Sequence, residues 1–156
     1  MLQVKFYDHV DDNLLKYAVI IARTGNKWVF CKHKDRNTYE IPGGHREAGE
    51  AILDAARREL YEETGALHFE LKPICVYSVI QFDSEDIVSP APESYGMLYY
   101  AEITAFEGEL HHEIDSILIT DRLVKSWTYP AIQPRLLEEA KRRGYVDFKE
   151  EIMTDG

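Results

Sequence analysis

GHREAGEAILDAARRELYEETGA, residues 44–66, is the segment around which the rest of this chain is arranged. Residues 50–64 contain neither proline nor glycine and are rich in Ala, Leu, Glu and Arg, which predicts a helix. Gly65 follows directly, where a glycine commonly ends a helix by adopting a left-handed backbone conformation. The segment therefore predicts a loop, a helix of about four turns and a sharp exit from it.

Three glutamates of this helix, Glu59, Glu62 and Glu63, recur at i, i+3 and i+4 and so share one face. The apolar residues of the helix point toward the same side, which places the acids at the rim of the buried face. Two carboxylates about 4 Å apart repel by roughly 4 kcal/mol at an effective dielectric constant near 20. Arg58 can offset one acid, and a hard divalent cation such as Mg²⁺ would offset the rest. The alternative is a solvated charged helix face.

The whole segment resembles the Nudix box. That pattern is Gly, five residues, Glu, seven residues, Arg-Glu, an aliphatic residue, any residue, Glu-Glu, any residue, Gly and an aliphatic residue. The matching positions are Gly44, Glu50, Arg58, Glu59, Leu60, Glu62, Glu63 and Gly65, with Ala66 at the last aliphatic position. A pattern of this many fixed spacings is far more specific than a lone glycine-rich loop. The preceding residues 39–44, YEIPGG, are similar to the usual lead-in of the family.

The resemblance implies an α/β/α sandwich with a mixed β-sheet and a catalytic cluster of Glu59, Glu62 and Glu63. It implies that these glutamates and the carbonyl of Gly43 hold Mg²⁺, for which Mn²⁺ is a substitute. It also implies that Glu50 and Arg58 support the site, Arg58 by pairing with the carboxylates. Groups that orient metal ligands in this way typically matter by 10–100-fold.

Length and composition predict a single domain over residues 1–156, with the box at 44–66. The net charge of −10 argues against a general nucleic-acid-binding surface. Cys31 and Cys75 lie in apolar runs, and we expect them to be core residues in a reducing cytoplasm. We expect a cytoplasmic protein without a signal peptide or a membrane span. The sequence is compatible with a homodimer but does not indicate an oligomeric state.

Apolar and alternating runs predict strands at residues 2–7, 17–22, 28–33, 71–82, 95–103 and 117–120. A second helix is predicted at 131–143, and its apolar face consists of Leu136, Leu137 and Ala140. The acidic segments 83–94 and 106–115 are predicted loops.

Basic and glycine residues before the helix are candidates for binding substrate phosphates, namely Arg23, Lys34 and Gly44. For the basic residues the alternative is a solvated loop. Many proteins with this box carry an additional Glu before a late strand as general base or metal ligand, and Glu113 fits that description. Glu102 competes with Glu113 for this role. A zinc site at residues 111–113, HHE, and a base-stacking role for one of the aromatic residues remain weaker alternatives.

The resemblance implies Mg²⁺-dependent hydrolysis of a diphosphate linkage, in which a carboxylate takes a proton from an attacking water. A nucleoside triphosphate would give the monophosphate and pyrophosphate. Motifs typical of the ADP-ribose, dinucleoside-polyphosphate, NADH and coenzyme A branches are absent, and the lead-in is most similar to the bacterial MutT-like branch. We therefore expect a small-molecule nucleotide substrate, 8-oxo-(d)GTP, with RNA 5′ ends or ADP-ribose as alternatives. A non-catalytic nucleotide-sensing module is a further alternative, but such modules often lack box glutamates.

Overall fold

A computed structural model of the chain describes residues 2–81, 92–108 and 114–150. Its strands are β1 (Leu2–Tyr7), β2 (Leu15–Thr24), β3 (Lys27–His33), β4 (Gly43–His45), β5 (Ala66–Gln81), β6 (Ser94–Phe106) and β7 (Ile114–Thr120). The helices are α1 (Ile52–Thr64) and α2 (Gln133–Arg142), and a short 3₁₀ turn, Asp12–Leu14, precedes β2.

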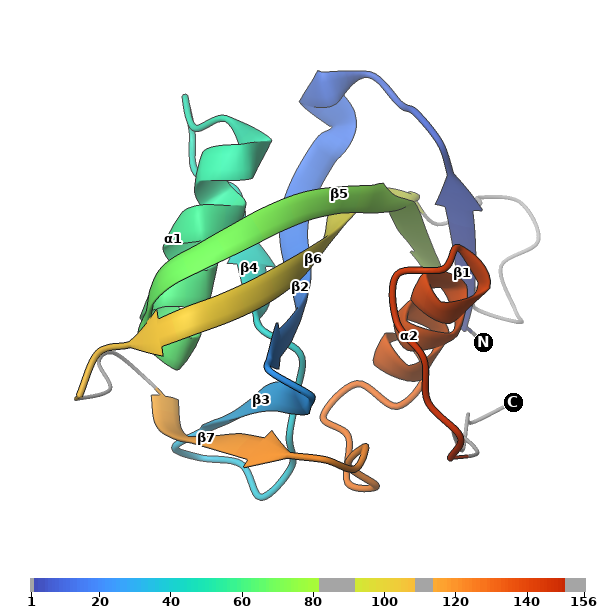
Figure 1. Cartoon of the computed structure of the whole chain (residues 1–156). Helices are drawn as coiled ribbons and strands as arrows, with labels where there is room; N and C mark the ends of the chain where they lie inside the picture. The colour runs from blue at the N-terminus through green and yellow to red at the C-terminus, as the bar shows by residue number, and fades with distance from the viewer. Residues whose placement is uncertain (1, 82–91, 109–113, 151–156) are drawn as a thin grey trace.

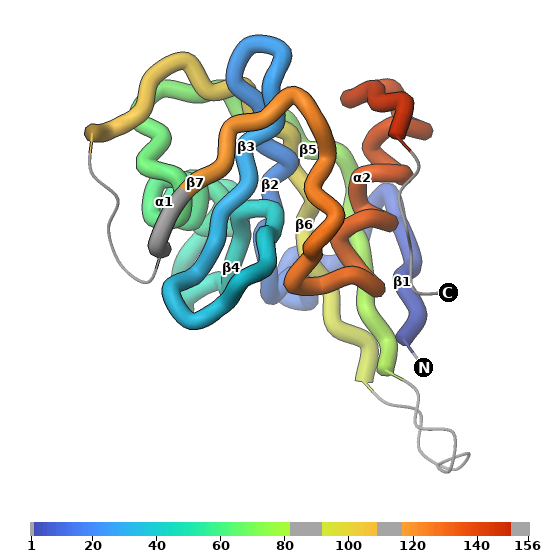
Figure 2. The backbone as a smooth tube through the Cα atoms, turned by 90° about the horizontal axis from the view of Figure 1, so that it is seen from below, coloured from blue at the N-terminus to red at the C-terminus, as the bar shows by residue number. Residues whose placement is uncertain are grey.

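The strands form one mixed sheet in the order β1-β5-β6-β2-β3-β7, with the short β4 also paired to β2. β2 and β6 run parallel, whereas the other pairs are antiparallel. Figure 2 shows β3 and β7 together at one end of the sheet and β1 at the other. β3 and β4 share one edge of β2, because β3 pairs with residues 22–24 and β4 with residues 17–19.

The two helices cover opposite faces of this sheet (Figure 1). Successive residues of β2 point to opposite faces of the sheet. Ile20 and Ala22 pack in the apolar cluster between the sheet and α1, whereas Ile21 packs in the apolar cluster between the sheet and α2. Each face thus has its own apolar core, and the predicted α/β/α sandwich with a mixed sheet is confirmed. Cys31 and Cys75 are buried as predicted.

Helix α1 begins at Ile52, two residues after the predicted start, and no side chain caps its first turn. Gly65 ends it as predicted, with φ of 74° and its N–H donating to the Tyr61 carbonyl at 2.8 Å. Leu60 is fully buried against the sheet, so α1 is anchored one position from Glu59 and two positions from Glu62.

Strand β5 is longer than the sequence predicts, because it begins at Ala66 and continues through Pro73. β1 pairs with residues 76–81 of β5 and does not reach Pro73. Among the described strands, Pro73 therefore has β6 as its one neighbour, and the β5–β6 register shifts between Pro73 and Cys75. Proline is tolerated at such a position because its missing N–H interrupts no ladder on the open side.

Helix α2 spans a shorter range than predicted, and Leu136, Leu137 and Ala140 are fully buried as expected. It packs against the face of the sheet opposite α1. Across the ranges that the structure describes, neither helix has the length and apolar character required to cross a membrane.

We predict that Leu60→Ala lowers the free energy of unfolding by about 3 kcal/mol, because it leaves a cavity between α1 and the sheet. Leu53→Ala is the matched control on the same helix, since Leu53 is 39% exposed, and it should cost less than about 1 kcal/mol. Chemical denaturation measures both values. Equal losses for the two variants would contradict the packing described above.

Candidate active site

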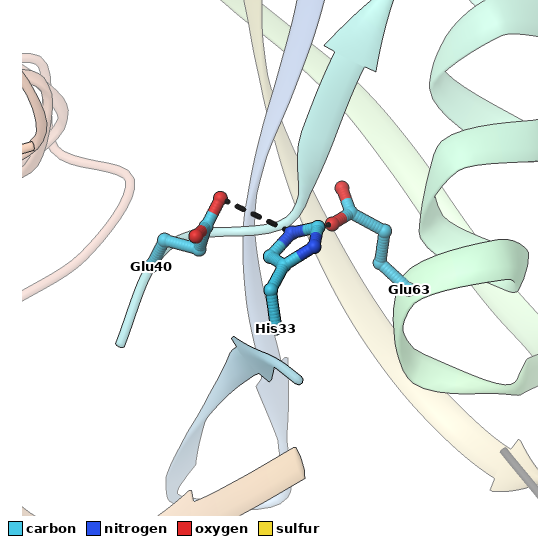
Figure 3. A group of neighbouring side chains, drawn as sticks. All are labelled: His33, Glu40 and Glu63. Atoms are coloured by element: carbon cyan, nitrogen blue, oxygen red, sulfur yellow. Dashed lines mark hydrogen bonds and ion pairs between the residues drawn. The ribbon is translucent and has the colours of Figure 1, made fainter. Parts of the chain in front are cut away.

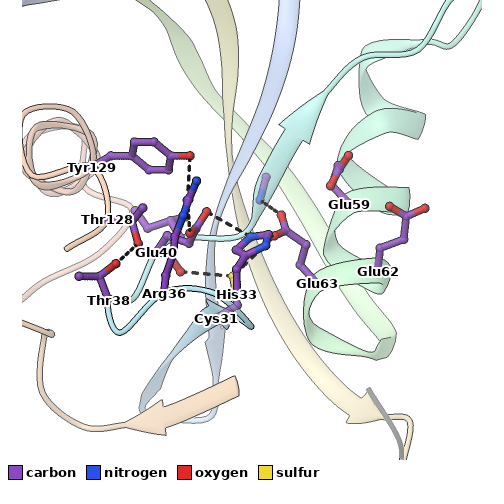
Figure 4. A network of polar contacts seen from close by, with 12 residues as sticks. Cys31, His33, Arg36, Thr38, Glu40, Glu59, Glu62, Glu63, Thr128 and Tyr129 are labelled. Carbon is purple, nitrogen blue, oxygen red and sulfur yellow. Dashed lines mark hydrogen bonds and ion pairs between the residues drawn. The ribbon is translucent and has the colours of Figure 1, made fainter. Parts of the chain in front are cut away.

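The three box glutamates project from α1 in different directions: Glu63 points toward His33, whereas the Glu62 carboxylate points away from it (Figure 4). Their side chains are exposed to different degrees: 7% for Glu63, 13% for Glu59 and 32% for Glu62. The acids therefore lie at the rim of the buried face, as the helical spacing predicts. The sheet side of the rim is closed by β4, which pairs with β2.

Arg58 is the cation at the centre of this cluster. Its Nε and Nη2 donate to the two carboxylate oxygens of Glu50 at 2.8 and 3.0 Å. Its Nη1 donates to Glu59 Oε1 at 2.9 Å and to Glu62 Oε2 at 3.2 Å. Its Nη2 also donates to the His45 carbonyl at 3.0 Å. One planar guanidinium thus joins the loop before α1 to two of the three candidate metal ligands.

The contacts of Arg58 leave Glu50 and Glu59 with different tendencies to ionise. The bidentate Arg58 contact lowers the pKa of the Glu50 carboxyl to about 2 and raises the pKa of Arg58. Burial, with the charge of Glu63, raises the pKa of Glu59 despite its contact with Arg58. The Glu50 carboxylate is therefore stabilised by two hydrogen bonds from Arg58. For Glu59, burial and the charge of Glu63 disfavour the ionised form.

The backbone of Gly43 and Gly44 approaches the acids closely. A Cβ atom on Gly44 would lie 2.4 Å from Glu59 Oε1, and one on Gly43 would lie 2.6 Å from the Ala18 carbonyl oxygen. The Gly43 N–H donates to Glu63 Oε1 at 2.7 Å. The two glycines are thus explained by the narrow space between β2 and α1.

Glu63 has further partners that the sequence did not reveal. His33 Nε2 lies 3.1 Å from Glu63 Oε2 and 3.5 Å from Glu40 Oε2 (Figure 3). The hydrogen bond to Glu63 raises the pKa of His33, and burial raises the pKa of Glu40. Arg36 Nη1 donates to Glu40 Oε1 at 3.3 Å.

The donor set fits the cation that the sequence predicts. Glu59, Glu62 and Glu63 offer carboxylate oxygens, which Mg²⁺ prefers, and they carry more negative charge than Arg58 neutralises. Burial and the neighbouring Glu63 raise the pKa of Glu59, so a nearby positive charge would favour its ionised form. Mn²⁺ accepts the same oxygens.

A cavity of about 510 Å³ is lined by Glu40, Gly43 and Gly44, which contact the cluster, but by none of the three box glutamates themselves. It lies between the Gly43–Gly44 backbone and the start of α2, and its size suits a nucleotide-sized ligand. The aromatic and polar side chains that line it include Tyr17, Tyr77, Glu40, Tyr129 and Gln133.

The three residues predicted to bind substrate phosphates do not lie together in the structure. Gly44 lines the cavity. Arg23 lies over the Trp28 ring at 4.1 Å, four residues along β2 from Val19, which pairs with Gly43. Lys34 is exposed in the turn after β3. Of these three, the structure brings only Gly44 into the cluster.

The two candidates for an additional acidic residue also differ. Glu102 accepts hydrogen bonds from the Gly25 N–H and from the Tyr100 hydroxyl, both at 2.9 Å, so it is bound to the β2–β3 turn. Glu113 and the rest of the HHE segment lie outside the described residues. The role of Glu113 therefore stays a prediction.

Glu40, Tyr17, Tyr77 and Gln133 were not singled out by sequence reasoning. Glu40 precedes the Ile-Pro-Gly-Gly turn and faces inward because it is bridged to Cys31 of β3. The period-two alternation of β3, which puts Cys31 and His33 on one face, was a signal that could have found His33. The Gln133 side chain accepts the Ile41 N–H at 2.7 Å, a contact between segments 92 residues apart that no local pattern reveals.

Comparisons with known proteins bear on the family and the fold of this chain. The family model for the NUDIX domain matches residues 14–145. A Bacillus subtilis (strain 168) protein named "Putative 8-oxo-dGTP diphosphatase YtkD" is 28% identical over 94% of this chain and 93% of its own length. An RNA pyrophosphohydrolase of Bartonella henselae is 46% identical over 50 residues, which are 30% of this chain and 29% of that protein. The crystal structure of the Bacillus subtilis pyrophosphohydrolase BsRppH superposes with a TM-score of 0.73 and 27% identity, covering 94% of this chain and 93% of that chain.

We predict that Gly44→Ala weakens Mn²⁺ binding by about tenfold or more, because the added methyl group displaces the Glu59 carboxylate. Gly108→Ala is the control, since a Cβ there meets nothing within 4 Å. Calorimetric titration of Mn²⁺ measures the effect. Unchanged Mn²⁺ affinity in a folded Gly44→Ala protein would show that Glu59 is not a ligand.

We predict that Glu50 contributes to the acid sensitivity of the protein. Its pKa is lowered from 4.5 to about 2 on folding, so its stabilising contribution is complete above about pH 4.5 and is lost as the pH falls toward 2. Glu50→Gln should therefore flatten the loss of stability between these pH values. Urea unfolding at several pH values measures it, with exposed Glu138→Gln on α2 as the control. Parallel curves for wild type and Glu50→Gln would contradict the prediction.

Proposed function

Since the chain belongs to the Nudix family of pyrophosphohydrolases, we propose that its substrate is a nucleoside triphosphate. The preferred substrate is 8-oxo-dGTP or 8-oxo-GTP, which it hydrolyses to the monophosphate and pyrophosphate. The observation that carries this proposal is that Arg58 joins Glu59 to Glu62 on α1 while the Gly43 N–H, at the wall of a cavity of about 510 Å³, holds Glu63. The proposed reaction removes oxidised guanine nucleotides from the nucleotide pool.

The chain supplies the parts that this hydrolysis needs. Mg²⁺ bound by Glu59, Glu62, Glu63 and the Gly43 carbonyl would neutralise phosphate charge and lower the pKa of a bound water. Arg58 fixes Glu59 and Glu62 through one guanidinium, which keeps the carboxylates in place before substrate arrives.

A carboxylate that accepts the proton of the attacking water completes the reaction. Glu62 is the best placed of the described box acids, because it is the most exposed of the three and its Oε1 has no contact with Arg58. Glu113 remains the alternative base.

The choice of an oxidised guanine nucleotide rests on two kinds of support. The relative that aligns over 94% of this chain is named as an 8-oxo-dGTP diphosphatase. The cavity beside the acids offers tyrosine rings for stacking against a base and the Gln133 and Glu40 side chains as polar groups at its wall.

RNA 5′ ends are the second candidate substrate, and a specific observation favours them. One relative is named as an RNA pyrophosphohydrolase, although it matches over only 50 residues. The net charge of −10 opposes this candidate, because an RNA chain beyond its first nucleotide would gain little from an acidic surface. ADP-ribose and a purely nucleotide-sensing role are weaker still, since all the box glutamates are present.

We predict that Glu62→Gln lowers kcat/KM for Mg²⁺-dependent hydrolysis at least about 100-fold, because the variant loses a carboxylate while keeping its shape. The matched control is Glu138→Gln, an exposed site on α2, which should retain wild-type turnover. Release of pyrophosphate measures the rate. Wild-type turnover in a folded Glu62→Gln protein would remove Glu62 from the mechanism.

A substrate panel separates the candidate activities. We expect kcat/KM to be highest for 8-oxo-dGTP or 8-oxo-GTP, compared at equal Mg²⁺ with unmodified dNTPs, ADP-ribose and 5′-triphosphate RNA. A preference for RNA would favour the second candidate. A preference for ADP-ribose would overturn the substrate proposed here and leave the role of the glutamates intact.

A further inference from the structure

We propose that His33, Glu40 and Glu63 form a second metal site, which takes a divalent transition-metal ion such as Zn²⁺ or Co²⁺. The site shares Glu63 with the proposed magnesium cluster but is otherwise made of residues outside the box. The proposal does not depend on which nucleotide is the substrate.

The three residues come from different elements that the fold brings together. His33 ends β3, Glu40 lies on the segment bridged to Cys31 of β3, and Glu63 lies in the last turn of α1. One ligand atom from each lies within 4.8 Å of the others. The separations of His33 Nε2 from the Glu63 and Glu40 Oε2 atoms are 3.1 and 3.5 Å. Around a tetrahedral ion, donors at about 2.0–2.2 Å are about 3.3–3.6 Å apart, so the Glu40 separation fits directly and the Glu63 separation is about 0.2 Å short.

A single ring nitrogen lies between the two carboxylates of this group, and Glu40 also has a side-chain hydrogen bond with Thr128. Two carboxylate oxygens face the single nitrogen His33 Nε2, which carries at most one proton. That proton can be donated fully to only one of them. A divalent ion in its place would bind the imidazole lone pair and both oxygens at once, and it would balance the two carboxylate charges.

The outer oxygens of the two carboxylates are already held by donors. Glu63 Oε1 accepts the Gly43 N–H at 2.7 Å, and Glu40 Oε1 accepts Arg36 Nη1 at 3.3 Å. Arg36 in turn donates to the Tyr129 hydroxyl at 3.2 Å. These contacts direct the two Oε2 atoms toward His33, as outer partners of metal ligands commonly do.

The site is closed from solvent on the side of the two glutamates and is accessible on the side of His33. The side chains of Glu40 and Glu63 are each 7% exposed, whereas that of His33 is 26% exposed. An ion could therefore enter past the imidazole and keep a water as its fourth ligand, as zinc sites with three protein ligands do.

The donor chemistry selects the class of metal. An imidazole nitrogen beside two carboxylates suits zinc and its neighbours in the first transition series, whereas Mg²⁺ and Ca²⁺ prefer oxygen alone. The Cys31 thiol lies 3.8 Å from Glu63 Oε2, but it is not part of the group whose ligand atoms all lie within 4.8 Å of one another. We therefore assign Cys31 no ligand role.

Occupancy of this site has a consequence for the magnesium cluster. With Glu63 Oε2 on the transition metal and Oε1 on the Gly43 N–H, the cluster keeps only Glu59 and Glu62. Zn²⁺ should therefore inhibit Mg²⁺-dependent turnover, and higher Mg²⁺ should relieve the inhibition through competition for Glu63.

The test is calorimetric titration of Zn²⁺ into the full chain without nucleotide, with Co²⁺ absorption as a second readout. We expect His33→Phe and Glu40→Gln each to weaken Zn²⁺ binding at least about tenfold. Exposed His68→Phe on β5 is the matched control and should bind Zn²⁺ like the wild type. Ring-nitrogen NMR of His33 should shift on adding Zn²⁺, which a loss of folding could not mimic.

Equal Zn²⁺ affinity in the wild type and in folded His33→Phe, without a His33 shift, would overturn the proposal. Because this titration contains no nucleotide, its outcome is separate from the fate of the proposed hydrolysis. In turnover assays the Glu40→Gln protein should need about tenfold more Zn²⁺ for half inhibition at the same Mg²⁺. Inhibition of Glu40→Gln at the wild-type Zn²⁺ concentration would also count against the site.

Discussion

Repulsion among carboxylates held at the edge of a buried helix face is the constraint on which this structure depends. Arg58 meets it only in part: it satisfies Glu50 with two hydrogen bonds and gives Glu59 and Glu62 one each. The pKa of Glu50 is lowered by its hydrogen bonds from Arg58, whereas burial and the charge of Glu63 raise the pKa of Glu59 despite Arg58. A bound divalent cation would favour the ionised form of Glu59.

The same constraint explains why the backbone of residues 43 and 44 is made of glycine. β4 must pair with β2 and still leave room for the Glu59 carboxylate, and a Cβ on either residue would enter space already filled. The core therefore fixes the site: β2 is buried on both faces, β4 is tied to β2, and α1 is held against the sheet by Leu60. Movement of any of these elements would change the distance between Gly43 and Glu63.

The parts that the sequence predicted are those governed by local periodicity. Helix α1, its end at Gly65, the strands predicted at 17–22 and 28–33 and the buried face of α2 all follow from spacing within one segment. The start of β5 at Ala66 was missed because proline is unusual inside a strand, whereas the absence of β1 beside Pro73 makes proline harmless there. Gln133 and Glu40 were missed because their partners are distant in sequence or on a neighbouring strand.

A chain of polar contacts joins the cavity to the acidic cluster, running through Tyr129, Arg36, Glu40, His33 and Glu63 (Figure 4). Each member holds the next by one hydrogen bond or ion pair, and Tyr129 and Glu40 also line the cavity. Tyr129 and Glu40 therefore connect the wall of the cavity to Glu63 without any residue of the box between them. Because each contact in the chain involves a charged partner, the removal of one member would change the electrostatic surroundings of the next. The cavity and the acidic cluster are thus joined by a continuous set of polar contacts.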